Sequence, residues 1–142
     1  MGAPAVNAIY DAARFSLLTA QLNWMSVQVT LSAWSGTPDF DPTDGTLADI
    51  KARGGVELAA SLPVLGNTVS LDGTAQTGPI VIPTVPIGAN VTWFTLATVN
   101  ATHDFSPPLL FIDEATDLPF VPNGLDMLVM PDWALNRGWF RP

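Results

Sequence analysis

The sequence predicts a mainly β protein: an antiparallel β-sandwich or jelly-roll-like barrel of about seven or eight strands with one N-terminal α-helix. Only one long stretch, near the start, spaces its apolar residues as a helix does. Beyond residue 55, glycine, proline and asparagine interrupt short apolar segments about every ten residues. A chain of 142 residues has the size of one domain, so we expect residues 1–142 to form a single unit.

The predicted helix covers about residues 7–21, with Asn7 as its expected cap. Four apolar residues lie on one stripe at helical spacing: Ile9, Ala13, Leu17 and Ala20. After the helix the apolar period changes to two, which predicts a half-buried strand over residues 25–34.

A loop rich in proline, glycine and aspartate follows this strand, and the pattern Thr46-x-x-Asp49 then predicts a short, capped helical turn. The remaining strand candidates are the apolar segments 56–65, 67–73, 79–87, 90–99, 109–115, 126–133 and 138–142. Segment 79–87 contains Pro79, Pro83 and Pro86. Because proline cannot donate to a β-ladder, we expect this segment at a sheet edge or in an extended connection.

Composition limits the possible partners. Thirteen acidic against five basic residues give a net charge of −8, which argues against direct binding of nucleic acid. No apolar run approaches the length of a membrane span, and without cysteine neither a disulfide nor a thiolate site can form. Charged residues make up only 13% of the chain, against about a quarter in typical domains. Such a surface suits a subunit partly covered by neighbours, with a compact monomer as the alternative.

The only histidine, His103, lies close to Asp104 and Ser106, so the residue types of a hydrolytic triad occur together. Neighbouring loop residues rarely point at one centre, and a solvated loop histidine is the favoured interpretation. The loop with Asp39, Asp41 and Asp44 is a weak candidate for calcium, because its spacing does not match an EF-hand. We expect no cofactor.

Five acidic residues gather in 111–133: Asp113, Glu114, Asp117, Asp126 and Asp132. They could serve a glycoside hydrolase, but successive strand residues face opposite sides of a sheet. Pro119, Pro122 and Asn123-Gly124 instead predict a chain reversal between two strands, with solvated acids around it. Most of the five tryptophans are expected in the core, with sugar stacking as the alternative.

The chain resembles a family of small virion-associated structural proteins of tailed bacteriophages. The similarity covers nearly the whole chain. It rests on the N-terminal helix with Asn7, Tyr10, Asp11, Ala13, Arg14, Asn23 and Trp24, the following strand, and the element with Leu47, Asp49 and Ile50. It also rests on the turn with Leu118-Pro119 and Asn123-Gly124 and on the closing aromatic pair Trp139-Phe140. The resemblance implies a role in the particle and brings no catalytic residues.

We therefore expect a non-enzymatic capsid cement or decoration subunit, located in the virion. Its partners would be the major capsid protein and sister copies, in a homo-oligomer such as a trimer. A head–tail connector or tail component is the closest alternative, and a carbohydrate-binding module and a small hydrolase belong to other classes. The expected interface residues are Pro79, Pro83, Pro86, Pro107, Pro108, Leu109, Trp139 and Phe140.

Overall fold

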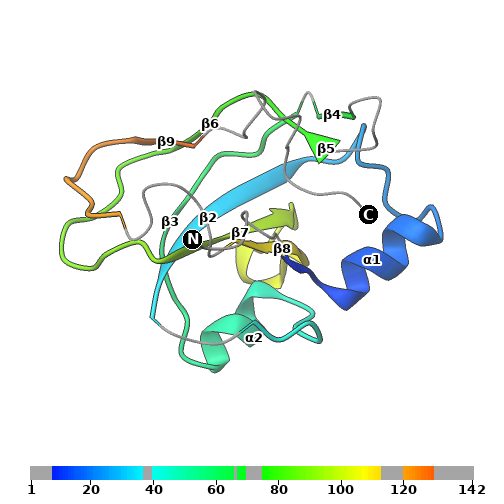
Figure 1. Ribbon diagram of the computed structural model, residues 1–142, viewed down its shortest axis with the longest axis horizontal. Coiled ribbons are helices and arrows are strands. Elements are labelled where there is room, and N and C mark those ends of the chain that lie inside the picture. Colours follow the sequence, from blue (N-terminus) through cyan, green and yellow to red (C-terminus); the bar gives the residue numbers. More distant parts are fainter. Residues whose placement is uncertain (1–7, 37–39, 66, 70–74, 113–119, 130–142) are drawn as a thin grey trace, which may run out of the picture.

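The structure, a computed structural model, describes residues 8–36, 40–65, 67–69, 75–112 and 120–129. Its centre is a five-stranded antiparallel sheet with the order β1-β8-β7-β2-β3 (Figure 1). In chain order these strands are β1 (Ala8–Ile9), β2 (Val29–Ser35), β3 (Val56–Ala60), β7 (Trp93–Thr98) and β8 (Pro108–Ile112). Two short antiparallel pairs join it, β4 (Thr68–Val69) with β5 (Ala75–Gln76) and β6 (Ile80–Ile82) with β9 (Met127–Val129). The prediction of a mainly β, sandwich-like fold is confirmed.

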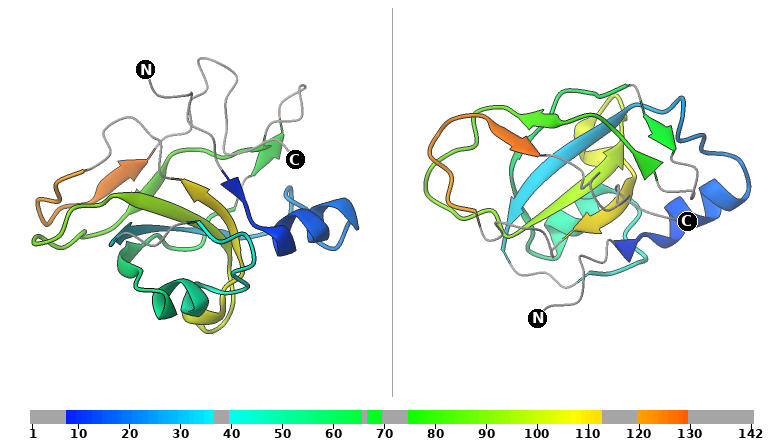
Figure 2. Two further views of the ribbon diagram at one scale, coloured as in Figure 1. Left: turned by 60° about the horizontal axis from the view of Figure 1, so that its bottom comes forward. Right: turned by 45° about the horizontal axis from the view of Figure 1, so that its top comes forward.

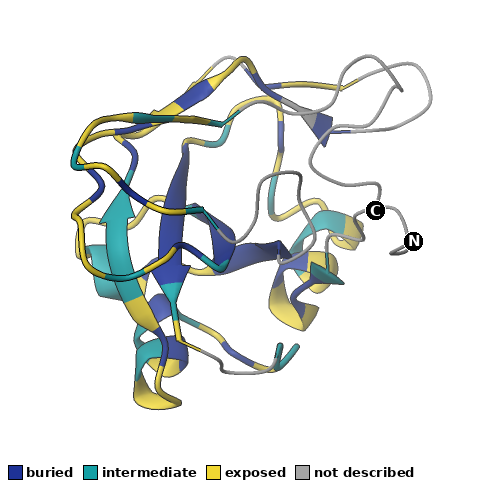
Figure 3. Cartoon of the chain, turned by 60° about the vertical axis from the view of Figure 1, so that its left-hand side comes forward, coloured by how far each residue is buried: buried dark blue, intermediate teal, exposed yellow. Residues whose placement is uncertain are grey.

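Other elements cover both faces of the central sheet. Helix α2 (Leu47–Ala52) and the 3₁₀ turn η1 (His103–Phe105) lie below the sheet in the left view of Figure 2, and the β6–β9 pair lies above it. Helix α1 (Asp11–Leu18) lies beside β8, at the opposite end of the molecule from β6 and β9 (Figures 1 and 2). The core therefore sits on both sides of β2, β7 and β8, which run dark blue through Figure 3.

Strand β2 differs from the sequence prediction. We predicted a half-buried strand over 25–34, but β2 begins at Val29 and every residue from Val29 to Trp34 is buried. The start is later because the backbone N–H groups of Ser26 and Val27 both donate to the Asn23 carbonyl, which closes a turn. Thr30 and Ser32 on β2 are buried because other elements cover both faces of the central sheet.

Buried aromatic rings fill the side of the sheet that carries Trp34. Trp34 and Trp93 are opposite one another on β2 and β7, and their rings stack with 4.8 Å between centroids. The Trp34 indole N–H donates to the Thr95 hydroxyl at 2.8 Å. Trp24 is also buried, so the expectation of core tryptophans is confirmed for these three, while Trp133 and Trp139 lie outside the described residues.

The N-terminal helix is shorter than the predicted 7–21. Ile9 belongs to β1, where it pairs with Leu110, and Tyr10 has extended backbone angles. The Tyr10 N–H donates to the Leu109 carbonyl, so a partner about a hundred residues away holds this stretch in the sheet. Asn7, the predicted cap, lies outside the described residues, and Tyr10 occupies the cap position without a side-chain bond.

The short helix α2 matches its prediction. The Thr46 hydroxyl accepts from the Asp49 N–H, and the Asp49 carboxylate accepts from the Thr46 N–H, which completes a capping box. Gly55 then lets the chain pass close to the sheet: a Cβ there would lie 2.9 Å from Ile50 Cγ2 and 3.3 Å from Trp34 Cε3. The missing side chain at Gly55 thus allows α2 to pack against the Trp34 face.

The turn predicted in 111–133 is described over residues 120–129, and Asp113, Glu114, Asp117 and Asp132 lie outside the described residues. Asn123 and Gly124 form a turn, in which the Leu125 N–H donates to Asn123 Oδ1 and Gly124 has a φ of +83°. The two strands around this region do not pair with each other. Strand β8 belongs to the central sheet, whereas β9 pairs with β6.

Candidate functional site

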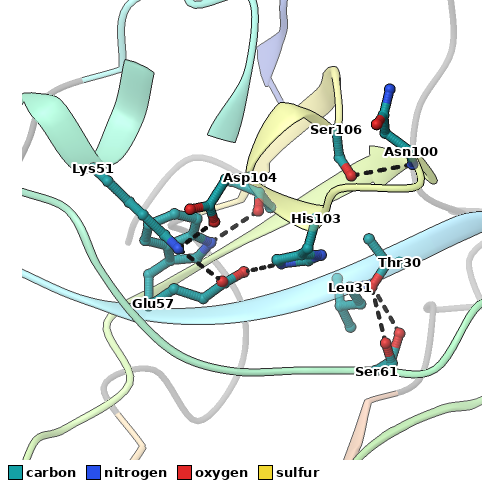
Figure 4. A network of polar contacts seen from close by, with 11 residues as sticks. Thr30, Leu31, Lys51, Glu57, Ser61, Asn100, His103, Asp104 and Ser106 are labelled. Atoms are coloured by element: carbon teal, nitrogen blue, oxygen red, sulfur yellow. Dashed lines mark hydrogen bonds and ion pairs between the residues drawn. The ribbon is translucent and has the colours of Figure 1, made fainter. Parts of the chain in front are cut away.

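Four charged or titratable side chains form a network where α2 and η1 meet the edge of the central sheet (Figure 4). The Glu57 carboxylate on β3 lies 2.7 Å from His103 Nε2 and 3.4 Å from Lys51 Nζ. Lys51 also donates to Asp104 Oδ1 at 2.5 Å. The network therefore ties α2, β3 and η1 together through side chains that are far apart in sequence.

The electrostatics of Lys51 and Asp104 follow from this pairing. Burial lowers the pKa of Lys51, but the hydrogen bond to Asp104 and the negative charges of Glu57 and Asp104 outweigh it, so its pKa is raised. The hydrogen bond from Lys51 lowers the pKa of Asp104. Both side chains are thus held in their charged forms at neutral pH.

The triad residue types near His103 are not brought together as a triad. His103 turns to Glu57, Asp104 turns to Lys51, and the buried Ser106 hydroxyl accepts from the Asn100 N–H at 3.3 Å. A histidine oriented by a carboxylate could act as a base, but no hydroxyl among the described residues is bonded to this ring. His103 is paired with Glu57 and 39% of its side chain is exposed, so the ring is only partly solvated and is not the free loop histidine that was expected.

The acidic loop before α2 does not converge on one point. Asp41 accepts from the Thr43 hydroxyl and N–H, and these bonds lower the pKa of Asp41. Asp44 is buried and paired with the Arg53 guanidinium, whose pKa is raised mainly by that hydrogen bond. Asp39 lies outside the described residues. Within the ranges that the structure describes, no three histidine or acidic side chains gather as metal ligands.

A second feature is an exposed apolar surface on the β6–β9 pair and its connecting loops. Ile80 and Ile82 of β6 are buried against the sheet, which turns Val81 and its cross-strand partner Leu128 outward. We call this area the ribbon surface. It consists of Val81, Ile87, Val121, Leu125 and Leu128, each between 47% and 74% exposed.

We call the β6–β9 pair with its connecting loops the ribbon, and the part beyond Ile82 and Met127 its end. Hydrogen bonds join the two sides of the ribbon at this end. Thr84 has a φ of +46°, and its N–H donates to Asp126 Oδ1 at 2.9 Å. The Val85 N–H donates to the Leu125 carbonyl, which joins the two sides of the ribbon beyond the strands. Ile87 lies over Gly124, where a Cβ would be 3.5 Å from Ile87 Cδ1. The apolar side chains at this end are thus presented by a hydrogen-bonded structure.

The expected interface residues fall into three groups. Pro79, Pro83 and Pro86 are exposed on the ribbon, and among the described strands β6 pairs with β9 alone, as predicted for an edge. Pro107 is exposed, but Pro108 and Leu109 are buried in β8, so their side chains are covered within the single chain. Trp139 and Phe140 lie outside the described residues.

Charge is distributed unevenly between these features. Between Glu57 and His103 the sequence has one charged residue, Asp72, and residues 120–129 contain only Asp126. Among the described residues 80–91 and 120–129, which include the β6–β9 pair and its loops, Asp126 is therefore the one charged side chain. The charged network lies on the other side of the central sheet.

A third feature is a groove of about 510 Å³ between α1, the turn after it and the ends of β7 and β8. None of the described residues that line it is charged. They are Ala12, Ala13, Ser16, Ala20, Gln21, Leu22, Asn23, Ser26, Val27, Thr98, Pro107, Pro108 and Leu109.

Comparison of the chain with protein-family models, curated proteins and solved structures gives no match. None of the helices in the described part of the chain has the length and apolar character of a membrane span.

Sequence reasoning missed the charged network because Glu57 and His103 are 46 positions apart. The one available signal was the single lysine, Lys51, in a chain with so few cations. The ribbon was indicated by its prolines, but its pairing with residues 127–129 and the groove beside α1 had no local signal.

Proposed function

We propose that the protein is a non-enzymatic structural subunit of a tailed-phage particle, a capsid cement or decoration protein that binds capsid proteins and sister copies. One observation carries the proposal: the ribbon surface is apolar and nearly uncharged on a chain of net charge −8. Exposed apolar areas of this kind are typical of protein contacts. The resemblance of the sequence to small virion proteins supports the place of action.

The proposed mechanism is mechanical. Each subunit buries the ribbon surface against neighbours on the particle, and removal of these apolar side chains from water favours the contact. Capsid symmetry repeats the contact many times. A weak single contact is then enough to stabilise the shell, because contacts that the particle links to one another add up to a high avidity.

The test is rebinding of purified protein to particles that lack it, in the phage that encodes the chain. We expect wild-type protein to bind, and the Leu128→Asp variant to lose most binding because it places a charge on the ribbon surface. Leu62→Asp is the matched control, since Leu62 is also an exposed leucine, at 76% against 60% for Leu128, and lies outside the ribbon. Equal binding of all three proteins would contradict the proposal.

Copy number separates cement from connector. Hundreds of copies per particle are expected for a cement subunit. A count of about five, six or twelve, as a vertex ring would give, would replace the cement assignment by a connector or tail component.

A further inference from the structure

The β6–β9 pair and α1 lie at opposite ends of the molecule (Figures 1 and 2). The ribbon surface on the β6–β9 pair is therefore far from the groove, which is lined by residues of α1, the turn after it, β7 and β8. At the end of the ribbon, Ile87, Val121 and Leu125 expose 66% to 74% of their surface. A volume of about 510 Å³ lies within the range that proteins use to enclose groups of this kind.

The two areas also agree in polarity. The groove is lined by small, apolar and neutral polar side chains, and α1 presents Phe15 and Leu18 as further exposed apolar residues. An apolar ribbon end would lose water in this groove without forcing any charge out of water. Asp126, the one acid of the ribbon in 120–129, already accepts the Thr84 N–H.

Net charge favours this contact between two copies over others. Each copy carries −8, so copies that meet through acidic areas repel each other. A contact between the ribbon end and the groove buries apolar side chains against a lining whose described residues carry no charge, and it does not involve Lys51, Glu57, His103 or Asp104.

We propose that the end of the ribbon, with Ile87, Val121 and Leu125, inserts into the groove beside α1 of a second copy of this chain. The proposal rests on the proposed function and names the partner of the ribbon surface. Because the two areas differ and lie at opposite ends, the contact is head-to-tail, and repetition gives a ring or a row of copies.

Two variants test the two sides separately. Val121→Glu/Leu125→Glu places acids on the ribbon end and leaves the groove intact. Ala12→Glu/Gln21→Glu places acids in the groove at two exposed positions and leaves the ribbon intact. Gln28→Glu is the matched control, because Gln28 is an exposed glutamine outside the groove lining. Circular dichroism and thermal unfolding confirm that each variant is folded.

Sedimentation velocity over a concentration series measures the association. We expect wild type and Gln28→Glu to associate, and each double variant alone to associate at least about tenfold more weakly. An equimolar mixture of the two double variants is expected to form a 1:1 dimer and nothing larger. One intact ribbon end meets one intact groove there, and both remaining sides are blocked.

Three results would overturn the proposal. These are a monomeric wild type, a mixture that stays monomeric, or unchanged association of the groove variant, which would indicate a symmetric ribbon-to-ribbon contact. Particle rebinding separates this from the proposed function. If the groove variant bound particles as wild type does while the ribbon variant did not, the ribbon would contact the capsid protein directly; the inference would fall and the proposed function would stand.

Discussion

Tyr10 is the only tyrosine of the chain, and its environment makes it a specific probe of the core. Its side chain is fully buried, its ring meets Phe40 edge-on with 4.9 Å between centroids, and its hydroxyl has no hydrogen-bond partner within the described residues. Burial, and then the negative charge of Asp44, raise the pKa of Tyr10. The folded protein therefore keeps the phenol neutral where an unfolded chain would ionise it.

We expect the Tyr10→Phe variant to be at least as stable as wild type at neutral pH and to lose less stability in alkali. The pKa of Tyr10 in the folded state lies above the unfolded value of about 10, so the stability of the wild type is unaffected by this group below about pH 10 and falls as the pH rises further. The free energy of unfolding then decreases by up to about 1.4 kcal/mol per pH unit for this one proton. Lys51, whose pKa is also raised, leaves a residual slope of the same sign in the variant.

Urea unfolding of wild type and Tyr10→Phe at about pH 7, 10 and 11 checks this prediction. Tyrosinate absorbance of the folded protein gives an independent reading, since only one tyrosine contributes. Ionisation near pH 10 in the folded state, or equal alkaline slopes for both proteins, would show that Tyr10 is not held in the neutral form.

At the scale of elements, the Glu57 carboxylate on the edge strand β3 binds side chains of α2 and η1 and so links both to the central sheet. Its side chain is only 10% exposed, and it holds Lys51 of α2 and His103 of η1. Charge-assisted bonds to a nearly buried carboxylate are among the stronger side-chain hydrogen bonds. We expect Glu57→Ala to lower the free energy of unfolding by about 1–3 kcal/mol.

A double-mutant cycle of Glu57→Gln and His103→Gln, measured by urea unfolding, isolates their pairwise contribution. Asp104→Asn is the comparison variant. Because Asp104 is half exposed, its substitution should lower the free energy of unfolding by less than substitution of Glu57. Additive effects of the Glu57 and His103 substitutions would mean that the bond seen at 2.7 Å contributes nothing to stability.

Elements were predictable where their cause is local. The capping box of Thr46 and Asp49 and the turn at Asn123-Gly124 depend on neighbouring residues, and both were found from the sequence. The start of α1 was predicted too early, because Ile9 fits the apolar stripe of a helix as well as it fits a strand. Its pairing with Leu110 of β8, about a hundred residues away, places it in a strand. The burial of Thr30 was missed for the same reason, since its hydroxyl donates to the Ser61 carbonyl, 31 positions away.

At the scale of the whole molecule, the candidate site could be predicted only in part. The prolines of 79–87 correctly indicated a sheet edge with exposed apolar residues. The outward direction of Val81 depends on its pairing with Leu128 and on the burial of its neighbours, and these follow from tertiary packing. Pro108 and Leu109 also combine proline with apolar neighbours in the sequence, as residues 79–87 do. Their side chains are nevertheless buried, because β8 is covered on both faces.

The net charge gives a last prediction about association. Copies of charge −8 repel each other over about 30 Å at 0.01 M salt but only about 8 Å at 0.15 M salt. Asp126 is the one charged residue that the structure describes at the ribbon end, and none of the described residues lining the groove is charged, so the proposed contact rests on apolar burial and not on ion pairs that salt would weaken. We therefore expect self-association to become severalfold tighter when salt is raised over this range, because screening removes repulsion and leaves the apolar contact intact.

Sedimentation equilibrium of the wild type at the two salt concentrations measures this effect, and the Val121→Glu/Leu125→Glu variant serves as the control that stays weakly associated at both. Contacts made by ion pairs respond in the opposite direction, since salt screens their attraction. Association that weakens with salt would therefore place charged side chains at the interface between copies. The Lys51, Glu57, His103 and Asp104 network would then be the first surface to examine, because it gathers the only lysine and the only histidine of the chain.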